Sequence, residues 1–332
     1  MRARLHQIIC VAALMIASGA EARVPVTKLE RVEFLGRDYV RLRDWARSNS
    51  FSFAWVAHGE VVRVNAGSVT LVFRADSRAV EVNGIKVWLS YPVAVRGANA
   101  YIALVDMQTS IEPVVFPRKN SRLISVVALD PGHGGKDKGY HKGSVEEKKY
   151  TLLLARELRS QLERAGFSVV LTRDSDVRVA LADRPAVAKR RGAHLFVSLH
   201  FNSTSVGSDT VRGAEVYCLT PPGGRSTSAR VGVADTHPGS RFNDESVLLA
   251  FCIQRALVKE AGLEDRGVRR AQFEVLRAAA MPAVLVEAGF MSHPDEGAKI
   301  RDSAYRRELA RAVTSGLIEY KRTVESANYR DR

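Results

Sequence analysis

Short apolar runs alternate with longer segments of helical periodicity between residues 124 and 321. This alternation predicts a parallel or mixed sheet covered by helices, because each connection between parallel strands must cross the sheet. We expect strands at 124–129, 167–172, 194–199, 212–219, 273–276 and 282–287, and helices at 146–165, 180–191, 245–261 and 303–321. The predicted fold class is α/β, an open, twisted, mainly parallel sheet flanked by helices.

Residues 23–117 show a different pattern, with short strand-like runs and one expected helix at 38–48. Asn83-Gly84 separates two of these runs, and this dipeptide is a strong hairpin signal. The pattern predicts a small β-rich α+β domain. A polar, basic linker at 118–123 would join it to the α/β domain at 124–321, and residues 322–332 would form a C-terminal tail.

The N-terminus has the features of a secretion signal. Arg2 and Arg4 precede an apolar run at 8–17, and Ala20-Glu21-Ala22 matches an A-x-A cleavage site. The run is shorter than the ~20 apolar residues that a membrane span needs, and no other stretch is apolar enough. We therefore expect residues 1–22 to be removed, no transmembrane segment in the mature chain, and a periplasmic or extracellular location.

The chain of 332 residues is strongly basic, and loss of Arg2, Arg4 and Glu21 with the signal lowers its formal charge from +14 to +13. A basic surface favours anionic polymers, of which nucleic acid is the usual one. Secretion indicates instead an extracytoplasmic polyanion, such as a cell wall or an anionic membrane face. Only Cys218 and Cys252 follow the signal, which excludes a scaffold built on disulfides and leaves open whether these two pair.

The motif Asp130-Pro131-Gly132-His133-Gly134-Gly135 follows the first apolar run of the α/β part. Proline and glycine end the strand in a sharp turn, so His133 lies at its carboxyl end, where open α/β sheets bind ligands. A phosphate-binding loop is a poor fit, because Lys136 is followed by Asp137 rather than by Ser or Thr. The motif alone leaves a metal-binding or catalytic His133 and an ordinary turn histidine equally open.

Glu147 opens the expected helix that follows this loop. At 100° per residue it shares the apolar stripe of Leu154 and Leu158, where an unpaired carboxylate is costly and a metal would compensate the cost. The competing interpretation is a capping box, because Ser144 and Glu147 fit the pattern S-x-x-E.

A second histidine, His200, ends the expected strand at 194–199. Together with His133 and Glu147 it would form a His₂Glu set, a known catalytic zinc pattern that keeps a position open for water. His194 begins the same strand and therefore lies at the opposite edge, where we expect a structural role. The remaining histidines of interest lie in loops without such placement: His141, His237 and His293.

Glu287 ends the apolar run at 283–286 and precedes Ala288-Gly289-Phe290. A second carboxylate beside an activated water can act as general base and then as proton donor. The alternative is a charged residue that meets solvent at the end of a strand. The apolar run and Gly289 favour the catalytic role.

These motifs, taken in order, resemble those of the zinc-dependent N-acetylmuramoyl-L-alanine amidases, amidase type 3, over residues 124–321. The resemblance rests on 130–135, Glu147-Lys148 with Leu152, Leu181 with Arg184, 198–202, 265–268, 275–277 and 281–290. The sequence departs from the family at Ser292-His293, where Ser-Asn is usual, and at His194, where Asp is usual.

The resemblance implies that His133, Glu147 and His200 bind Zn²⁺ and that Glu287 is the catalytic glutamate. It overrules the capping box at Glu147. The implied activity is hydrolysis of the amide between the lactyl group of N-acetylmuramic acid and L-alanine of the stem peptide of peptidoglycan, in cell-wall remodelling or cell separation. Involvement of an activator protein is left open.

Residues 23–117 resemble the N-terminal-type domain of copper amine oxidases through 36–42, Val82-Asn83-Gly84 and 101–104. This resemblance implies a binding or spacing module rather than copper chemistry, since the segment has no clustered His or Cys. Three rival functions remain: a module that grips peptidoglycan without cutting it, a zinc peptidase for a different amide, and a nucleic-acid binder, which the secretion signal disfavours.

Overall fold

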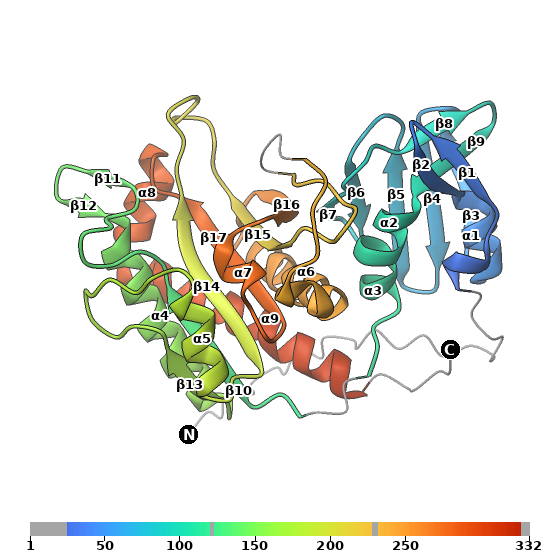
Figure 1. Ribbon diagram of the computed structural model, residues 1–332. Coiled ribbons are helices and arrows are strands. Elements are labelled where there is room, and N and C mark those ends of the chain that lie inside the picture. The colour runs from blue at the N-terminus through green and yellow to red at the C-terminus, as the bar shows by residue number, and fades with distance from the viewer. Residues whose placement is uncertain (1–24, 120–122, 228–231, 327–332) are drawn as a thin grey trace, which may run out of the picture.

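The computed structural model describes residues 25–119, 123–227 and 232–326 (Figure 1). The expected signal peptide at 1–22 lies outside the described residues, as do residues 120–122 of the expected linker and 327–332 of the expected tail. In the described part of the chain, no helix combines the length and the apolar character needed to cross a membrane.

Six strands of the second half form a sheet with the expected, mainly parallel topology. Their spatial order is β13 (Ser168–Leu171), β10 (Val126–Pro131), β14 (Leu195–Asn202), β17 (Ala283–Phe290), β15 (Ala214–Leu219) and β16 (Asp265–Ala271). The first four are parallel, β15 is antiparallel to β17, and β16 is parallel to β15. The prediction of an α/β fold is confirmed.

Helices cover both faces of this sheet (Figure 1). Successive residues of a strand point to opposite faces, so Val197 joins the core under α4 (Glu147–Arg164), α6 (Asn243–Lys259) and α9 (Ser303–Ser326). Phe196 joins a smaller core under α5 (Asp183–Arg190) and α7 (Glu274–Arg277). A short helix, α8 (Pro294–Arg301), packs against α9.

Two expected elements differ from the structure, and one strand was not expected. The strand expected at 273–276 is the helix α7, and the strand of this region lies earlier, at β16. Strand β16 has no apolar pattern that would predict it, because its sequence is Asp-Arg-Gly-Val-Arg-Arg-Ala. Arg270 of this strand is buried by tertiary contacts, although its side chain is charged. The final helix continues to Ser326, beyond the expected end at 321.

The N-terminal region is β-rich, as expected. Its strands are β1 (Arg31–Phe34), β2 (Arg37–Arg41), β3 (Ser52–Ala57), β4 (Val61–Ala66), β5 (Val69–Arg74), β6 (Ala79–Val82), β7 (Ile85–Trp88), β8 (Ala94–Arg96) and β9 (Asn99–Ala103). Asn83 and Gly84 take φ values of 51° and 75° in the β6–β7 turn, which confirms the hairpin. The helix expected at 38–48 is shorter, because the backbone pairs as strand β2 before α1 (Leu42–Ser48) begins.

Short helical turns complete this region and the loops. They are η1 (Val26–Lys28), α2 (Leu104–Asp106), the π-helix η2 (Met107–Ile111), α3 (Glu112–Val115) and, in the second half, η3 (Pro238–Phe242). The thiols of Cys218 and Cys252 are both buried and free, so these two cysteines do not pair in this structure.

Part of the N-terminal region shares a sheet with the α/β part, which the sequence does not predict. Strand β7 pairs in parallel with β16 through Val87 and Val268, so β3 to β7 and the six strands of the α/β part form one 11-stranded sheet (Figure 1). The other N-terminal strands form a separate four-stranded sheet in the order β1, β2, β9, β8. Trp88 Nε1 donates to the carbonyl of Arg266 at 2.8 Å. The guanidinium of Arg270, which is almost fully buried, donates to Ser110 Oγ of η2 at 3.1 Å.

Candidate active site

His133 lies on a tight loop at the carboxyl end of β10. Its φ is +61°, and Gly134 follows at +128°, so the chain turns through backbone conformations that favour glycine. Gly132 is required for a different reason, since a Cβ there would lie 2.2 Å from Cε1 of His200. The loop therefore brings two histidine rings together only because its glycine has no side chain.

Two buried arginines fix this loop by binding its carbonyl groups. Arg184 donates to the carbonyls of Pro131 and His133, each at 2.9 Å, and Arg173 donates to Pro131 at 2.9 Å. Arg184 also pairs with the buried carboxylate of Asp130 at 2.8 Å. The two arginines thus satisfy loop carbonyls that would otherwise be unpaired, and several hydrogen bonds together fix the position of His133.

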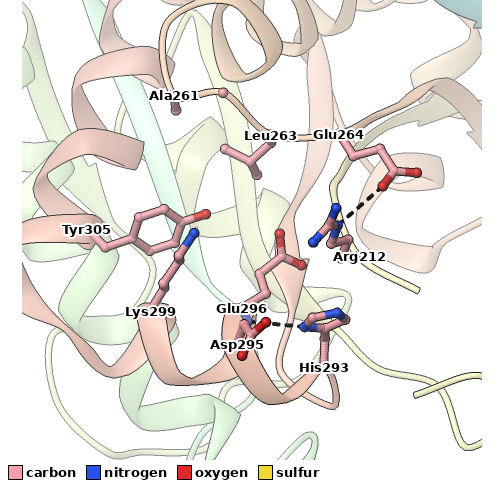
Figure 2. A pocket seen from close by; sticks show the side chains of 10 residues that line it. Arg212, Ala261, Leu263, Glu264, His293, Asp295, Glu296, Lys299 and Tyr305 are labelled. Carbon is pink, nitrogen blue, oxygen red and sulfur yellow. Dashed lines mark hydrogen bonds and ion pairs between the residues drawn. The ribbon is translucent and has the colours of Figure 1, made fainter. Parts of the chain in front are cut away.

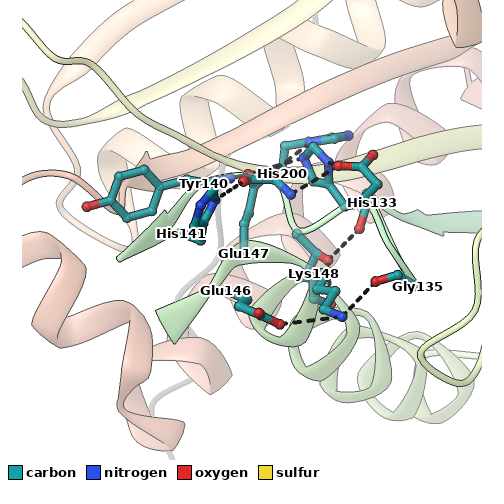
Figure 3. Close-up of polar contacts among 12 residues, drawn as sticks. His133, Gly135, Tyr140, His141, Glu146, Glu147, Lys148 and His200 are labelled. Atoms are coloured by element: carbon teal, nitrogen blue, oxygen red, sulfur yellow. Dashed lines mark hydrogen bonds and ion pairs between the residues drawn. The ribbon is translucent and has the colours of Figure 1, made fainter. Parts of the chain in front are cut away.

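Glu147 is the first residue of α4, and its carboxylate is only 5% exposed. One of its oxygens accepts the N–H of Tyr140 at 2.9 Å (Figure 3). The other accepts the N–H of Phe201 at 3.1 Å. It does not cap the helix, so the capping-box interpretation is wrong for this side chain. Gly139 makes room for it, because a Cβ there would lie 2.4 Å from Glu147 Oε2.

The three residues expected to bind metal converge on one point (Figure 3). Glu147 Oε2 lies 3.1 Å from His133 Nε2, and Oε1 lies 3.1 Å from His200 Nδ1. All the candidate ligand atoms lie within 4.8 Å of one another, and among the described residues this is the one such group that the structure contains. Two imidazole nitrogens and a carboxylate oxygen are a donor set that fits Zn²⁺.

The electrostatics of this cluster also fit a cation. Burial raises the pKa of Glu147, but hydrogen bonds from His133 and His200 outweigh it and leave that pKa well below its usual value. Burial lowers the pKa of His133, but its hydrogen bonds with Glu147 and Asp137 outweigh it and raise that pKa. A buried carboxylate held ionised between two imidazoles is a ready ligand for a divalent ion.

Glu287 lies on β17, directly opposite His200 on β14. Within the described residues its Oε2 atom is buried and has no hydrogen-bond partner. Burial, followed by the charges of Glu147 and Glu215, raises the pKa of Glu287 well above its usual value. An unpartnered buried carboxyl oxygen beside a candidate metal site has the placement that a proton-transfer group needs.

These groups line a cavity of about 320 Å³. Its lining includes the His–Glu–His cluster and Glu287. It also includes the apolar residues Leu181, Phe273, Val275 and Leu285, of which Leu181 and Phe273 are 51% and 36% exposed. The cavity can therefore hold a polar reacting group while apolar parts of the same ligand contact its apolar lining.

Sequence reasoning missed two acidic residues of the site. Asp137 Oδ1 lies 2.9 Å from Nδ1 of His133, on the side of the ring that faces away from Glu147. Glu215 stands opposite Glu287 on β15 and pairs with Arg266 at 2.6 Å. The spacing His-x-x-x-Asp within the glycine-rich loop could have indicated Asp137. Only the register of β15 and β17 identifies Glu215.

His194 lies where the sequence predicts it, whereas His141, expected in a loop, is part of a short strand, and His237 and His293 directly precede helices. His194 is at the opposite end of β14, where its Nδ1 accepts the N–H of Ser125 at 3.0 Å, a structural role. His293 is the N-cap of α8, and its Nδ1 accepts the N–H of Glu296 at 3.3 Å. His141 lies in the exposed hairpin of β11 (His141–Lys142) and β12 (Val145–Glu146). None of these histidines joins the cluster.

A second cavity, of about 390 Å³, lies between the α6–β16 turn and the helices α8 and α9 (Figure 2). Its central carboxylate, Glu296, already accepts the N–H groups of Gly213 and Phe290. Arg212 pairs there with Glu264 at 3.5 Å. These groups are occupied in holding loops, so the larger cavity is not the candidate active site.

Comparisons with known proteins agree with this geometry. The family described as N-acetylmuramoyl-L-alanine amidase matches residues 127–319, more than half of the chain. The chain is 36% identical over 243 residues to N-acetylmuramoyl-L-alanine amidase AmiC of Neisseria meningitidis, covering 66% of this chain and 58% of that protein. It is 32% identical over 220 residues to AmiA of Escherichia coli, covering 59% of this chain and 75% of that protein.

Two solved structures share the fold. The amidase AmiC2 of Nostoc punctiforme aligns with a TM-score of 0.50 at 32% identity, over 59% of this chain and 96% of that one. An N-acetylmuramoyl-L-alanine amidase of Clostridium difficile 630 aligns with a TM-score of 0.50 at 31% identity, over 62% of this chain and 100% of that one. The match over residues 127–319 agrees with the fold and the site described above, and it shows that the chain belongs to the N-acetylmuramoyl-L-alanine amidase family, amidase type 3.

Proposed function

We propose that this protein is a zinc-dependent peptidoglycan hydrolase. It cleaves the amide between the lactyl group of N-acetylmuramic acid and L-alanine of the stem peptide. The observation that carries the proposal is the convergence of His133, Glu147 and His200 within 4.8 Å, with the free carboxyl oxygen of Glu287 beside them. Family membership supports the choice of bond.

The chain's own residues divide the work. His133, Glu147 and His200 hold the ion, and a bound zinc ion would polarise the scissile carbonyl and lower the pKa of a water to roughly 7. Glu287 takes the proton from the attacking water and then gives it to the leaving amine of alanine. Burial favours the protonated form of Glu287, whereas a nearby cation favours the carboxylate. A bound metal ion would therefore help to keep Glu287 ionised, which is the form that accepts a proton.

The cavity lining suits the proposed substrate. The lactyl and alanyl groups on either side of the scissile amide each carry a methyl group, and the apolar lining residues Leu181, Phe273, Val275 and Leu285 can contact them. The strongly basic composition of the chain favours approach to an anionic wall polymer. We propose a periplasmic or extracellular location, with removal of residues 1–22, and a role in wall remodelling or cell separation. We also propose that the N-terminal region binds or positions the enzyme on the wall.

Mass spectrometry of purified peptidoglycan digested with the zinc-loaded protein tests the proposal. The expected products are free stem peptides that begin with L-alanine and glycan strands whose lactyl carboxyl groups are free. Cuts inside the stem peptide would show a peptidase instead. Peptidoglycan that is bound but left intact would show a binding module.

A further inference from the structure

Asp137 contacts the edge of the His133 ring that points away from the candidate metal site. Asp137 Oδ1 lies 2.9 Å from His133 Nδ1, whereas the other ring nitrogen, Nε2, lies 3.1 Å from Glu147 Oε2. The imidazole is thus held between two carboxylates, one on each nitrogen. The two carboxylates differ in exposure, since Glu147 is buried and the Asp137 side chain is 52% exposed. Of the two, Glu147 is the one that also contacts His200.

The backbone of the loop fixes Asp137 for this contact. The N–H of Gly134 donates to the carbonyl of Asp137 at 2.9 Å, and the N–H of Asp137 donates back to Gly134 at 3.2 Å. Asp137 Oδ1 also accepts the N–H of Gly139 at 3.1 Å. The carboxylate is therefore oriented by the same short loop that places His133 at a φ of +61°, so the orientation does not depend on a flexible partner.

A carboxylate on one nitrogen of an imidazole decides what the other nitrogen can do. If Nδ1 carries the proton that Asp137 accepts, the lone pair of Nε2 points towards Glu147 and His200. A hydrogen-bonded carboxylate also makes the ligating nitrogen more basic, and removing such a partner typically weakens metal binding by about 10–100-fold.

We propose that Asp137 is a positioning residue for the metal centre. It holds His133 in the tautomer and ring orientation that present Nε2 to the ion. The inference rests on the metal site of the proposed function, but it is independent of which amide the enzyme cuts.

The loop offers a matched control. Asp176 accepts the N–H of Gly135 at 2.8 Å and pairs with Lys148 at 2.8 Å, so it also stabilises this loop. Lys148 in turn donates to the carbonyl of Gly135 (Figure 3). Within the described residues, Asp176 has no hydrogen bond or ion pair with either histidine of the cluster. If Asp137 acts merely by stabilising the loop, Asp176→Ala should weaken metal binding as much as Asp137→Ala does.

Competition between the full-length protein and a chromogenic zinc chelator tests the proposal. We expect Asp137→Ala to lower zinc affinity about 10–100-fold. Asp137→Asn, which keeps an oxygen acceptor without the charge, should lose less. Asp176→Ala should bind zinc as the wild type does. Equal affinity of Asp137→Ala and wild type, or equal loss in both alanine variants, would overturn the proposal.

Nitrogen-15 NMR of the zinc-loaded protein gives a readout that a purely structural role would not move. The wild type should show a slowly exchanging Nδ1–H proton on His133, and Asp137→Ala should lose its protection. A wild type with the proton on Nε2 contradicts the assignment. A wild type that binds no zinc removes the metal centre and with it the proposed function, whereas normal zinc binding by Asp137→Ala removes only this inference.

Discussion

His200 and Glu287 stand opposite each other on the neighbouring parallel strands β14 and β17. Because parallel strands end at the same edge of a sheet, this register carries a candidate metal ligand and a candidate base to one place from sites 87 positions apart in the sequence. The Oε2 atom of Glu287 has no hydrogen-bond partner in the described residues. We therefore expect the two residues to have different roles, His200 as a metal ligand and Glu287 as the base.

Glu287→Gln should abolish most of the cleavage of a soluble muropeptide while zinc content stays at the wild-type level. The amide keeps the shape of the side chain but cannot accept the proton, and general acid–base catalysis is typically worth ~10²–10⁴-fold. Turnover and elemental analysis measure the two quantities. Glu264→Gln, at the second cavity, should keep full activity. Loss of zinc in Glu287→Gln would mean that Glu287 is a ligand rather than the base.

The double variant His133→Ala, His200→Ala should lose its zinc. Only Glu147 of the cluster would remain, and one carboxylate does not make a zinc site. Elemental analysis of the purified protein gives the metal content, with about one zinc per chain expected for the wild type. His141→Ala, in the exposed hairpin, is the control and should retain the metal. Full zinc occupancy in the double variant would rule out this ligand set.

Arg184→Ala should destabilise the protein strongly and displace the His133 loop. The substitution leaves the carboxylate of Asp130 buried without its charged partner, which typically costs about 3–5 kcal/mol. It also removes the donor to the carbonyl of His133, while the carbonyl of Pro131 keeps its bond from Arg173. Urea unfolding measures the cost. Arg190→Ala, exposed on the same helix, should change stability little, and equal stability of the two variants would contradict the anchoring role.

The full chain should unfold in one calorimetric transition. The shared sheet and the bonds of Trp88 and Arg270 couple the N-terminal region to the α/β part. A fragment that begins at Leu123 would leave the edge of β16 unpaired and expose Arg270, so it should melt at a lower temperature. Two independent transitions in the full chain, with an unchanged melting temperature for the fragment, would show that the regions are separate modules.

Stability should fall as the pH rises from about 4 to about 6 through the contribution of Asp106. Burial raises the pKa of this fully buried carboxyl from 3.8 to about 6, so the folded state binds the proton more tightly than the unfolded state. The contribution is fully present below the unfolded pKa and is lost as the pH passes the folded pKa, a change of about 3 kcal/mol. Urea midpoints against pH measure it, and Asp106→Asn should remove this slope. An unchanged slope would contradict it.

Much of the α/β part could be predicted from the sequence. The apolar runs that become β10, β14, β15 and β17 are buried on both faces, so they stand out as strands of a covered sheet. The helices with strong apolar stripes, α4, α6 and α9, were equally clear. By contrast, β16 is rich in arginine, and its identity as a strand depends on pairing with β15 and β7.

The sequence by itself determined the candidate metal ligands, since a histidine on a glycine-rich turn, a glutamate on a buried helical stripe and a histidine at a strand end are local patterns. Tertiary structure alone decided three further features. These are the contact of Asp137 with His133, the placement of Glu215 opposite Glu287, and the joining of β7 to β16. The first depends on the geometry of a turn, and the other two depend on the register between neighbouring strands. The periodicity of side chains along one segment carries no information about which residues of a neighbouring segment lie opposite.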